Sequence, residues 1–249
     1  MNSLNLAFKP TPLQPLNTMG KLFNIELWIK RDDLSGDMLS GGNKARKLEY
    51  ILYDAKSKGA DTILVAGGPQ SNLAKTTAAL SIQQGLKPIL VLLGREPSSK
   101  KGNLFLDGLL GVETRFIEVS HPEELESAMS SIASELKLEG RNPYIVPFGA
   151  SNGLGALGYV DAYQEMVKQK EELGLQFDWE FVSAGSGGTY AGISVGRQIH
   201  NASSKLIGVS PWLAKGEVKE RILHCVEELI RLLDNVKDID SGADIGHCN

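Results

Sequence analysis

A short basic segment around position 44 contains a lysine that could act as a nucleophile. Lys44 follows Gly41–Asn43 and precedes an amphipathic stretch, so we expect it in the first turn of a helix. The partial positive charge of a helix N-terminus disfavours a cation there and lowers the pKa of a lysine amine. Such an amine is available for covalent catalysis. An ordinary surface lysine beside Arg46 and Lys47 is the alternative, and the spacing alone leaves both interpretations open.

A glycine-rich segment, Ser183–Thr189, joins a predicted strand to a predicted helix. Small residues let backbone N–H groups approach an anion closely, and two hydroxyls add further donors. This pattern indicates a phosphate site formed by Gly185, Ser186, Gly187, Gly188 and Thr189. A tight turn that needs positive φ is the simpler alternative. The segment is neither a P-loop, which needs Gly-Lys-Ser/Thr, nor a dinucleotide fingerprint, because Tyr190 occupies the place of the third glycine.

The same glycine-rich segment differs by one residue from the G-x-S-x-G nucleophile elbow of serine hydrolases. Ala184 stands where the first glycine would be, and Ser186 would be the nucleophile. A catalytic triad would need a downstream histidine, and His200, His224 and His247 all follow. None of the three has a distinctive context, so the hydrolase stays a minor alternative.

Two short polar residues, Ser71 and Asn72, end the turn Gly67–Gln70 and begin a predicted helix. Ser71 could simply be the N-cap of that helix, which is a common use of serine. Both side chains could instead point into a ligand site beyond the strand ends, where α/β proteins bind ligands. The residues themselves favour neither interpretation.

Two other groups are poor candidates for chemistry. Neighbouring helical residues point about 100° apart, so the pairs His224-Cys225 and His247-Cys248 are not expected to form a closed metal site, and we predict no metal. Asp32 and Asp33 should face opposite ways on an extended segment, which favours a salt bridge or a turn over paired acid–base catalysis.

Short apolar strands alternate with amphipathic helices through most of the chain. We expect strands at 62–66, 88–93, 113–119, 144–148, 180–184 and 206–209. We expect helices at about 43–59, 72–84, 103–110, 122–137, 155–174, 189–200 and 217–233. This alternation predicts βαβ units and parallel sheets. Two α/β lobes meeting at a cleft are favoured over one continuous sheet, because ligand-binding loops would then face each other.

Composition narrows the function classes. The 249 residues include 26 Lys and Arg and 30 Asp and Glu, a net charge of −4, which argues against a bulk electrostatic role on nucleic acid. No apolar run approaches the ~18 residues of a membrane span. Two cysteines fit a reducing compartment. We therefore expect a cytoplasmic protein with neither a nucleic-acid nor a membrane partner.

Five ordered motifs together resemble one enzyme family. They are KRDDL (30–34), GGNKARKLE (41–49), GGPQSN (67–72), SNGLGALGY (151–159) and SAGSGGT (183–189). The set is similar to the D-cysteine desulfhydrase and 1-aminocyclopropane-1-carboxylate deaminase family, which are pyridoxal-phosphate enzymes of the tryptophan-synthase-β fold type (fold type II). The last two motifs favour the desulfhydrase branch. The resemblance covers about residues 11–209.

The resemblance assigns a role to each candidate residue. Lys44 matches the lysine that bonds the cofactor aldehyde and later moves the substrate proton. Asn72 matches the residue that hydrogen-bonds the ring hydroxyl, and Ser71 matches one near the substrate carboxylate or reacting carbon. Gly185–Thr189 match the phosphate-binding loop, so the cofactor is expected in the cleft between the lobes.

The resemblance also implies a reaction and a domain layout. β-Elimination would convert D-cysteine to pyruvate, hydrogen sulfide and ammonia, whereas a deaminase would open a cyclopropane ring to give 2-oxobutanoate and ammonia. A small lobe is expected at 45–149, and a large lobe at 1–44 and 150–249 that lacks a C-terminal portion. A homodimer acting on a small amino acid is implied. Leu73 stands where relatives commonly have His or Gln, and the C-terminal portion of the large lobe is expected to be missing, so a truncated non-catalytic relative that keeps the fold is a further alternative.

Overall fold

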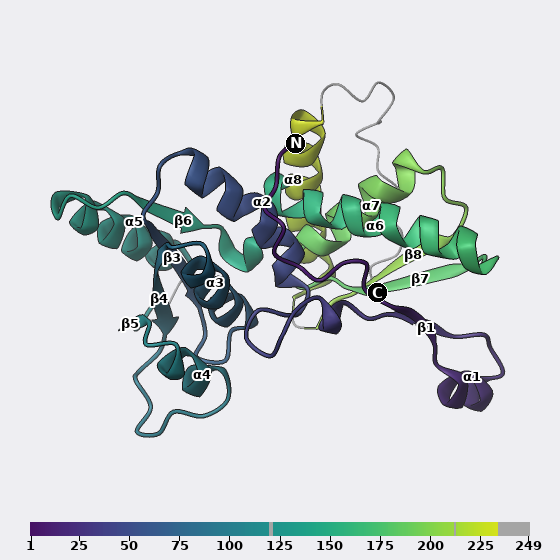
Figure 1. Cartoon of the computed structure of the whole chain (residues 1–249), viewed down its shortest axis with the longest axis horizontal. Coiled ribbons are helices and arrows are strands. Elements are labelled where there is room, and N and C mark those ends of the chain that lie inside the picture. Colours follow the sequence, from purple (N-terminus) through teal and green to yellow (C-terminus); the bar gives the residue numbers. More distant parts are fainter. Residues whose placement is uncertain (120–121, 212, 234–249) are drawn as a thin grey trace. The chain divides into compact units, whose positions relative to one another are not determined.

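The computed structural model describes residues 1–119, 122–211 and 213–233, and its ribbon is drawn in Figure 1. The chain divides into two compact units. The first unit comprises Met1–Leu6 and Asp37–Ala150, and the second comprises Ala7–Gly36 and Ser151–Asn249. The lobe ranges expected from the sequence stay a prediction.

The first unit is built on a four-stranded parallel sheet with the order β5-β4-β3-β6. The strands are β3 (Thr62–Gly67), β4 (Lys87–Leu93), β5 (Glu113–Ile117) and β6 (Pro143–Val146). Every residue of β3 is buried, as expected for a central strand covered on both faces. Leu64 pairs with Ile89 on one side and with Ile145 on the other. The predicted parallel sheet is therefore confirmed.

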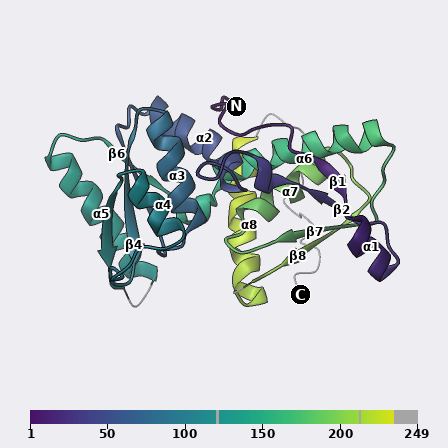
Figure 2. The ribbon, with the colours of Figure 1, turned by 60° about the horizontal axis from the view of Figure 1, so that its bottom comes forward.

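Helices cover both faces of this sheet, with α5 on one side and α3 on the other (Figure 2). They are α2 (Lys44–Ser57), α3 (Asn72–Gln83), α4 (Asn103–Leu109) and α5 (Pro122–Leu138). Alternate residues of the strands face α5 and form one buried cluster with it: Leu64, Ala66, Ile89, Val91, Met129, Ile132, Ala133 and Leu136. Each large apolar side chain in such a cluster contributes about 1.5–3 kcal/mol.

The second unit contains a two-stranded parallel sheet, β7 (Trp179–Ser183) with β8 (Lys205–Val209). Three helices pack against one another beside it: α6 (Gly153–Leu173), α7 (Gly188–Ile199) and α8 (Lys215–Leu232) (Figure 2). Helices α6 and α7 approach closely at Gly192. A Cβ atom at that position would lie 2.2 Å from the Ala156 carbonyl oxygen, so only glycine fits there.

The N-terminal part of the second unit forms an antiparallel pair that the sequence analysis did not predict. Strand β1 (Leu13–Pro15) pairs with β2 (Trp28–Lys30), and α1 (Asn17–Phe23) lies between them. Strands of three residues are too short to show alternation, which explains the omission. The expected extended segment at Asp32 and Asp33 is wrong: Asp32–Leu34 form a 3₁₀ turn, η1. Arg31 pairs with Asp33 at 2.7 Å, as the salt-bridge interpretation predicts.

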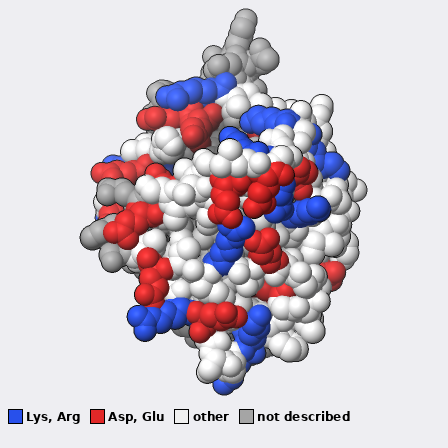
Figure 3. Space-filling view, turned by 90° about the vertical axis from the view of Figure 1, so that its left-hand side faces the viewer, with Lys and Arg blue, Asp and Glu red and all other residues white. Residues whose placement is uncertain are grey.

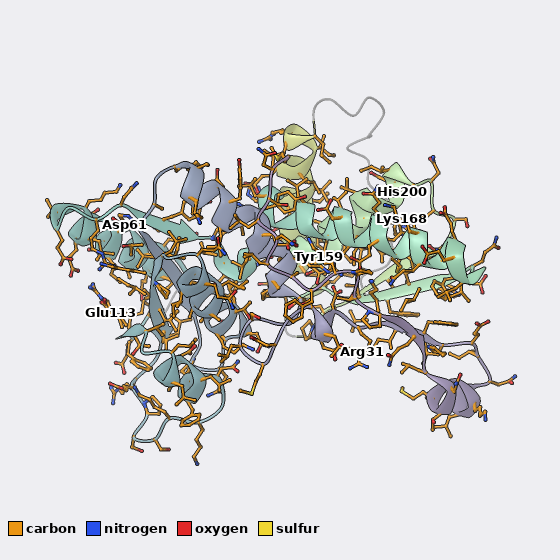
Figure 4. All side chains as sticks on the ribbon, viewed as in Figure 1. Arg31, Asp61, Glu113, Tyr159, Lys168 and His200 are labelled. Carbon is orange, nitrogen blue, oxygen red and sulfur yellow. The ribbon has the colours of Figure 1, made fainter. Side chains whose placement is uncertain are left out.

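Partly buried polar contacts connect this N-terminal segment to α6. Lys30 Nζ donates to the Thr11 carbonyl oxygen at 2.6 Å and forms an ion pair with Glu165. The Tyr159 hydroxyl donates to Asp32 Oδ2 at 2.8 Å, and Tyr159 and Arg31 are labelled in Figure 4. These charged groups are paired and hydrogen-bonded, so removing one partner would leave a partly buried charge without compensation.

Other departures from prediction are small. Strand β6 ends at Val146, and a second 3₁₀ turn, η2 (Phe148–Ala150), follows it where the strand was expected to continue. Strand β5 ends at Ile117 rather than at residue 119. Among the residues described, no helix is long and apolar enough to cross a membrane. On the face shown in Figure 3, acidic and basic side chains are interspersed.

Candidate active site

Lys44 is the first residue of α2 and lies half-buried at the N-terminus of that helix. Its N-cap residue, Asn43, provides no side-chain cap. The Lys44 amine makes no hydrogen bond or ion pair with any residue that the structure describes. Burial lowers the pKa of this amine, so the predicted direction is confirmed with burial as its cause. The interpretation as one of several surface lysines is wrong, since Arg46 and Lys47 are 1% and 0% exposed.

Ser71 is the N-cap of α3, and its Oγ accepts a hydrogen bond from the Ala74 N–H at 3.1 Å. The N-cap interpretation is thus confirmed. The bond uses a lone pair, so the hydroxyl proton stays available for donation to a second group. Asn72 follows as the first, exposed residue of the helix. Its Oδ1 accepts from Asn103 Nδ2 at 2.9 Å, which leaves the Asn72 NH₂ group as a donor.

The topology of the first unit brings Lys44 to the same sheet edge as Ser71 and Asn72. Only residues 58–61 connect the end of α2 to the start of β3. A helix of 14 residues rises about 21 Å, about the length of β3, so α2 returns its N-terminus toward the carboxyl end of that strand. Lys75 of α3 supports this placement, since its Nζ donates to the Met38 carbonyl oxygen at 2.8 Å, shortly before α2.

The glycine loop lies in the second unit, between β7 and α7. Gly187 has φ +90°, so the expected positive-φ turn is confirmed. The backbone N–H groups of Gly185, Ser186 and Gly187 have no hydrogen-bond partner in the described part of the chain, and α7 lacks a side-chain cap. Three successive unpaired N–H groups at a helix start form a concavity suited to an anion.

Ser151 supports this loop and was not predicted as a site residue. Its Oγ lies 2.7 Å from Ser186 Oγ and accepts from the Gly188 N–H at 3.2 Å. Ser151 directly precedes Asn152, the N-cap of α6, whose side chain accepts from the Gly155 N–H. The sequence signal for this role was the Ser-Asn pair before the glycine-rich start of α6. With Asn152 as the N-cap, the Ser151 hydroxyl lies outside the helix and can contact the neighbouring loop.

The serine hydrolase alternative gains no support. The hydroxyl partner of Ser186 is Ser151 rather than a histidine. The His200 ring lies tilted against that of Tyr163, with 6.3 Å between ring centroids, and His224 Nε2 lies 3.4 Å from Glu228 Oε1. His247, like Cys248, lies outside the described residues. No group of His, Cys, Asp and Glu suited to a metal occurs within the described ranges.

These features define an α/β protein with a partly buried, unpartnered lysine amine at one helix start and a glycine loop with unpaired backbone N–H groups at another, among the residues that the structure describes. The chain belongs to the family of pyridoxal-phosphate dependent enzymes, whose family model matches residues 4–223. The predicted family, fold class and cofactor, pyridoxal 5′-phosphate, are confirmed.

Relatives of both predicted branches are similar to this chain. A putative 1-aminocyclopropane-1-carboxylate deaminase of Pyrococcus abyssi is 42% identical over 228 residues, covering 91% of this chain and 68% of the relative. A D-cysteine desulfhydrase of Serratia proteamaculans is 36% identical, covering 97% of this chain and 73% of the relative. The crystal structure of an ACC deaminase homologue matches with a TM-score of 0.88 and 39% identity, covering 96% of this chain and 72% of that one. The chain thus spans about two thirds to three quarters of their length.

Proposed function

We propose that this chain is a pyridoxal-phosphate dependent lyase that acts on a small D-amino acid. The specific reaction is the conversion of D-cysteine and water to pyruvate, hydrogen sulfide and ammonia. The observation that carries the proposal is the Lys44 amine, half-buried, without a partner among the described residues and with a lowered pKa. An aldehyde reacts with the neutral form of an amine, and burial favours that form.

Lys44 has two tasks in this proposal. Its amine would hold the cofactor through the cofactor's aldehyde group until a substrate amine takes its place. The released amine, still near the substrate α-carbon, accepts the α-proton. When bound, the cofactor supplies an electron sink for the charge left on that carbon. A lysine that carried a permanent positive charge could perform neither step.

Ser71 and Asn72 act as hydrogen-bond donors in the proposed site. The Ser71 hydroxyl proton is not used by its N-cap bond, so it can donate to a substrate carboxylate oxygen. The Asn72 NH₂ group can donate to the ring hydroxyl oxygen of the cofactor. Both targets are electron-rich, and both residues have their acceptor atoms occupied by the protein itself. Each side chain therefore presents the polarity that its target requires.

The loop Gly185–Thr189 is proposed to hold the cofactor phosphate. Its unpaired N–H groups at the start of α7 are suited to a dianion, and the helix dipole adds a favourable field. Gly188 must be small, because a Cβ atom there would lie 2.7 Å from Ser151 Oγ and 2.9 Å from Ser151 Cα.

A second candidate function is 1-aminocyclopropane-1-carboxylate deamination, which yields 2-oxobutanoate and ammonia. The 42% identity with the Pyrococcus abyssi relative named for that activity favours it. Leu73 bears on both candidates. It is 4% exposed on α3, and its apolar side chain can neither donate nor accept a proton.

From the family resemblance we also propose that the chain is cytoplasmic and forms a homodimer. Analytical ultracentrifugation of the full chain would test the oligomeric state.

The proposal is tested with the purified chain and added pyridoxal 5′-phosphate. We expect a visible absorption band that borohydride abolishes, and release of sulfide and pyruvate from D-cysteine. Release of 2-oxobutanoate from the cyclopropane substrate instead would select the second candidate. Colour without either product would indicate a non-catalytic relative, and no uptake of cofactor at all would refute the proposal.

A loop variant separates phosphate binding from the lysine bond. Gly188→Ala should weaken cofactor binding by about tenfold or more, because a charge-assisted bond is worth ~1.5–3 kcal/mol. Gly216→Ala is the matched control, since a Cβ atom at Gly216 would meet nothing within 4 Å. Equal affinity in the two variants would contradict the role of the loop.

A further inference from the structure

Three side-chain amides lie together where the loops after β3 and β4 meet. These strands are parallel neighbours, so their carboxyl ends share one edge of the sheet. Gln70 belongs to the loop after β3, Asn72 begins α3, and Asn103 begins α4 after the loop that follows β4. We refer to Gln70, Asn72 and Asn103 as the amide clamp.

Gln70 fixes the start of α4 through both ends of its amide. Its Nε2 donates to the Lys101 carbonyl oxygen at 2.9 Å, and its Oε1 accepts from the Asn103 N–H at 3.0 Å. Gly102 lies between these contacts with φ +57° and ψ −131°. A Cβ atom there would come within 2.2 Å of Gln70 Oε1. The loop is thus shaped to receive this glutamine, and the backbone at Asn103 has a defined position.

Asn103 in turn fixes the side chain of Asn72 by a hydrogen bond. Its Nδ2 donates to the Gln70 carbonyl oxygen and to Asn72 Oδ1, both at 2.9 Å. An NH₂ group with two acceptors has used both of its protons. Asn103 can therefore not rotate its amide without losing two bonds. Asn72 must in turn keep Oδ1 toward Asn103 and point its own NH₂ group the other way.

We propose that Asn103, held by Gln70, is a positioning residue that fixes the amide orientation of Asn72 toward the cofactor ring oxygen. The inference rests on the proposed function and deepens it. An exposed asparagine on its own presents its oxygen and its NH₂ group to a ligand with similar ease. An Oδ1 atom facing an electron-rich ring oxygen would repel it, whereas the NH₂ group stabilises it.

A double-mutant cycle tests this inference on the full chain. We expect Asn103→Ala to weaken pyridoxal-phosphate affinity about 5- to 10-fold, the effect of one well-placed hydrogen bond. In an Asn72→Ala background the same change should alter affinity less than about twofold, because the group that Asn103 orients is gone. Equal losses in both backgrounds would overturn the proposal.

The spectrum gives a readout that a merely structural role would not change. Loss of the donated bond should shift the pH midpoint of the visible absorption band in Asn103→Ala and, to a similar extent, in Asn72→Ala. Asn142→Ala is the matched control: Asn142 Nδ2 also donates to two backbone carbonyls, of Lys58 and Gly59, at the opposite edge of the same sheet. It should lower the unfolding temperature without moving the midpoint. An unchanged midpoint in Asn103→Ala would refute the orienting role.

A second substitution keeps the test decisive if the alanine variant folds poorly. Asn103→Asp nearly preserves size but places acceptors where donors were, so Asn72 should reverse its amide, and affinity should fall at least as far as in Asn103→Ala. Unfolding temperatures of the cofactor-free variants show whether each is folded. If the parent chain binds no cofactor, the proposed function fails. If the parent binds it and Asn103→Asp binds equally well, only the positioning role fails.

Discussion

Two sets of buried or half-buried charged groups, one in each unit, differ in how they are partnered. In the first unit, the Lys44 amine and the Asp107 carboxylate form no hydrogen bond within the described residues, and both are partly or fully buried. In the second unit, Glu165 accepts from Lys30 and from the Thr11 N–H, and Asp32 accepts from Tyr159. Lys44 and Asp107 thus lack hydrogen-bond partners among the described residues, whereas Glu165 and Asp32 connect the N-terminal segment to α6. Other buried charges of the first unit are paired, as Glu49 is with the Leu6 N–H at 2.9 Å.

Within each unit, one helix start has a side-chain cap and another has none. Ser71 caps α3 and Asn152 caps α6 with their side chains. No side chain caps α2 or α7, whose first turns carry Lys44 and the glycine loop. Uncapped N–H groups need another partner. At α7 the N–H groups of Gly185, Ser186 and Gly187 are unpaired among the described residues, so a bound anion would satisfy them.

Replacing Lys44 should have the largest effect. Lys44→Ala should abolish the borohydride-sensitive band and lower kcat by about 10³-fold or more, the scale expected when a nucleophile and base is removed. Burial disfavours the charged amine, so the cofactor-free variant should unfold at the same temperature as the parent or higher. Lys56→Ala, at the exposed end of the same helix, should leave the band intact. A band that persists in Lys44→Ala would place the bond elsewhere.

Breaking a paired charge in the second unit should mainly affect stability. Glu165→Gln leaves Lys30 with a neutral partner in a partly buried site, and the free energy of unfolding should fall by about 1–3 kcal/mol, the scale of a hydrogen bond to a charged group. Glu172→Gln on the exposed side of α6 is the control and should change it by less than about 0.5 kcal/mol. Chemical denaturation measures both. A loss no larger than in the control would show that this network does not hold the N-terminal segment.

The unpaired carboxylate in the first unit should respond with the opposite sign. Burial raises the pKa of Asp107 to about 6, and Lys75 opposes the shift only partly. Above pH 6 the carboxylate is charged in both states and costs the folded state free energy; below its unfolded value near 3.8 it is neutral in both and the cost disappears. Asp107→Asn should therefore stabilise the protein at pH 7 by up to about 3 kcal/mol.

This gain should shrink as the pH falls from 7 to 4. Unfolding followed across that range, beside the exposed control Glu139→Gln, measures the trend. A variant that is less stable than the parent at pH 7 would mean that the carboxylate has a stabilising partner after all.

Sequence reasoning recovered the elements that depend on periodicity. The buried strand β3 and the amphipathic helix α8 were predicted to within two residues at each end, because burial on two faces or on one stripe dictates their composition. The β1–β2 pair was missed, since its stability comes from long-range contacts such as Lys30 with Glu165 rather than from local pattern.

The candidate site was predictable in its residue types but not in its hydrogen bonds. Glycines and a lysine at helix starts signal anions and nucleophiles through general principles. The partners Ser151 of Ser186 and Asn103 of Asn72 are separated by 35 and 31 residues in sequence. Such pairings depend on the order of the strands in the sheet and on the lengths of the loops between them. The local sequence around either partner therefore does not predict them.

The smallest expected effect is that of Ser186→Ala, which tests whether the backbone or the serine side chain of the glycine loop binds the phosphate. Ser186→Ala removes the hydroxyl that contacts Ser151 but leaves the N–H groups of Gly185, Ser186 and Gly187 in place. If the backbone binds the anion, pyridoxal-phosphate affinity should fall less than about threefold, within the net worth of one neutral hydrogen bond. Equilibrium titration of the band measures it. A loss as large as in Gly188→Ala would assign the anion to the hydroxyl, and labelling of Ser186 by a fluorophosphonate would revive the hydrolase alternative.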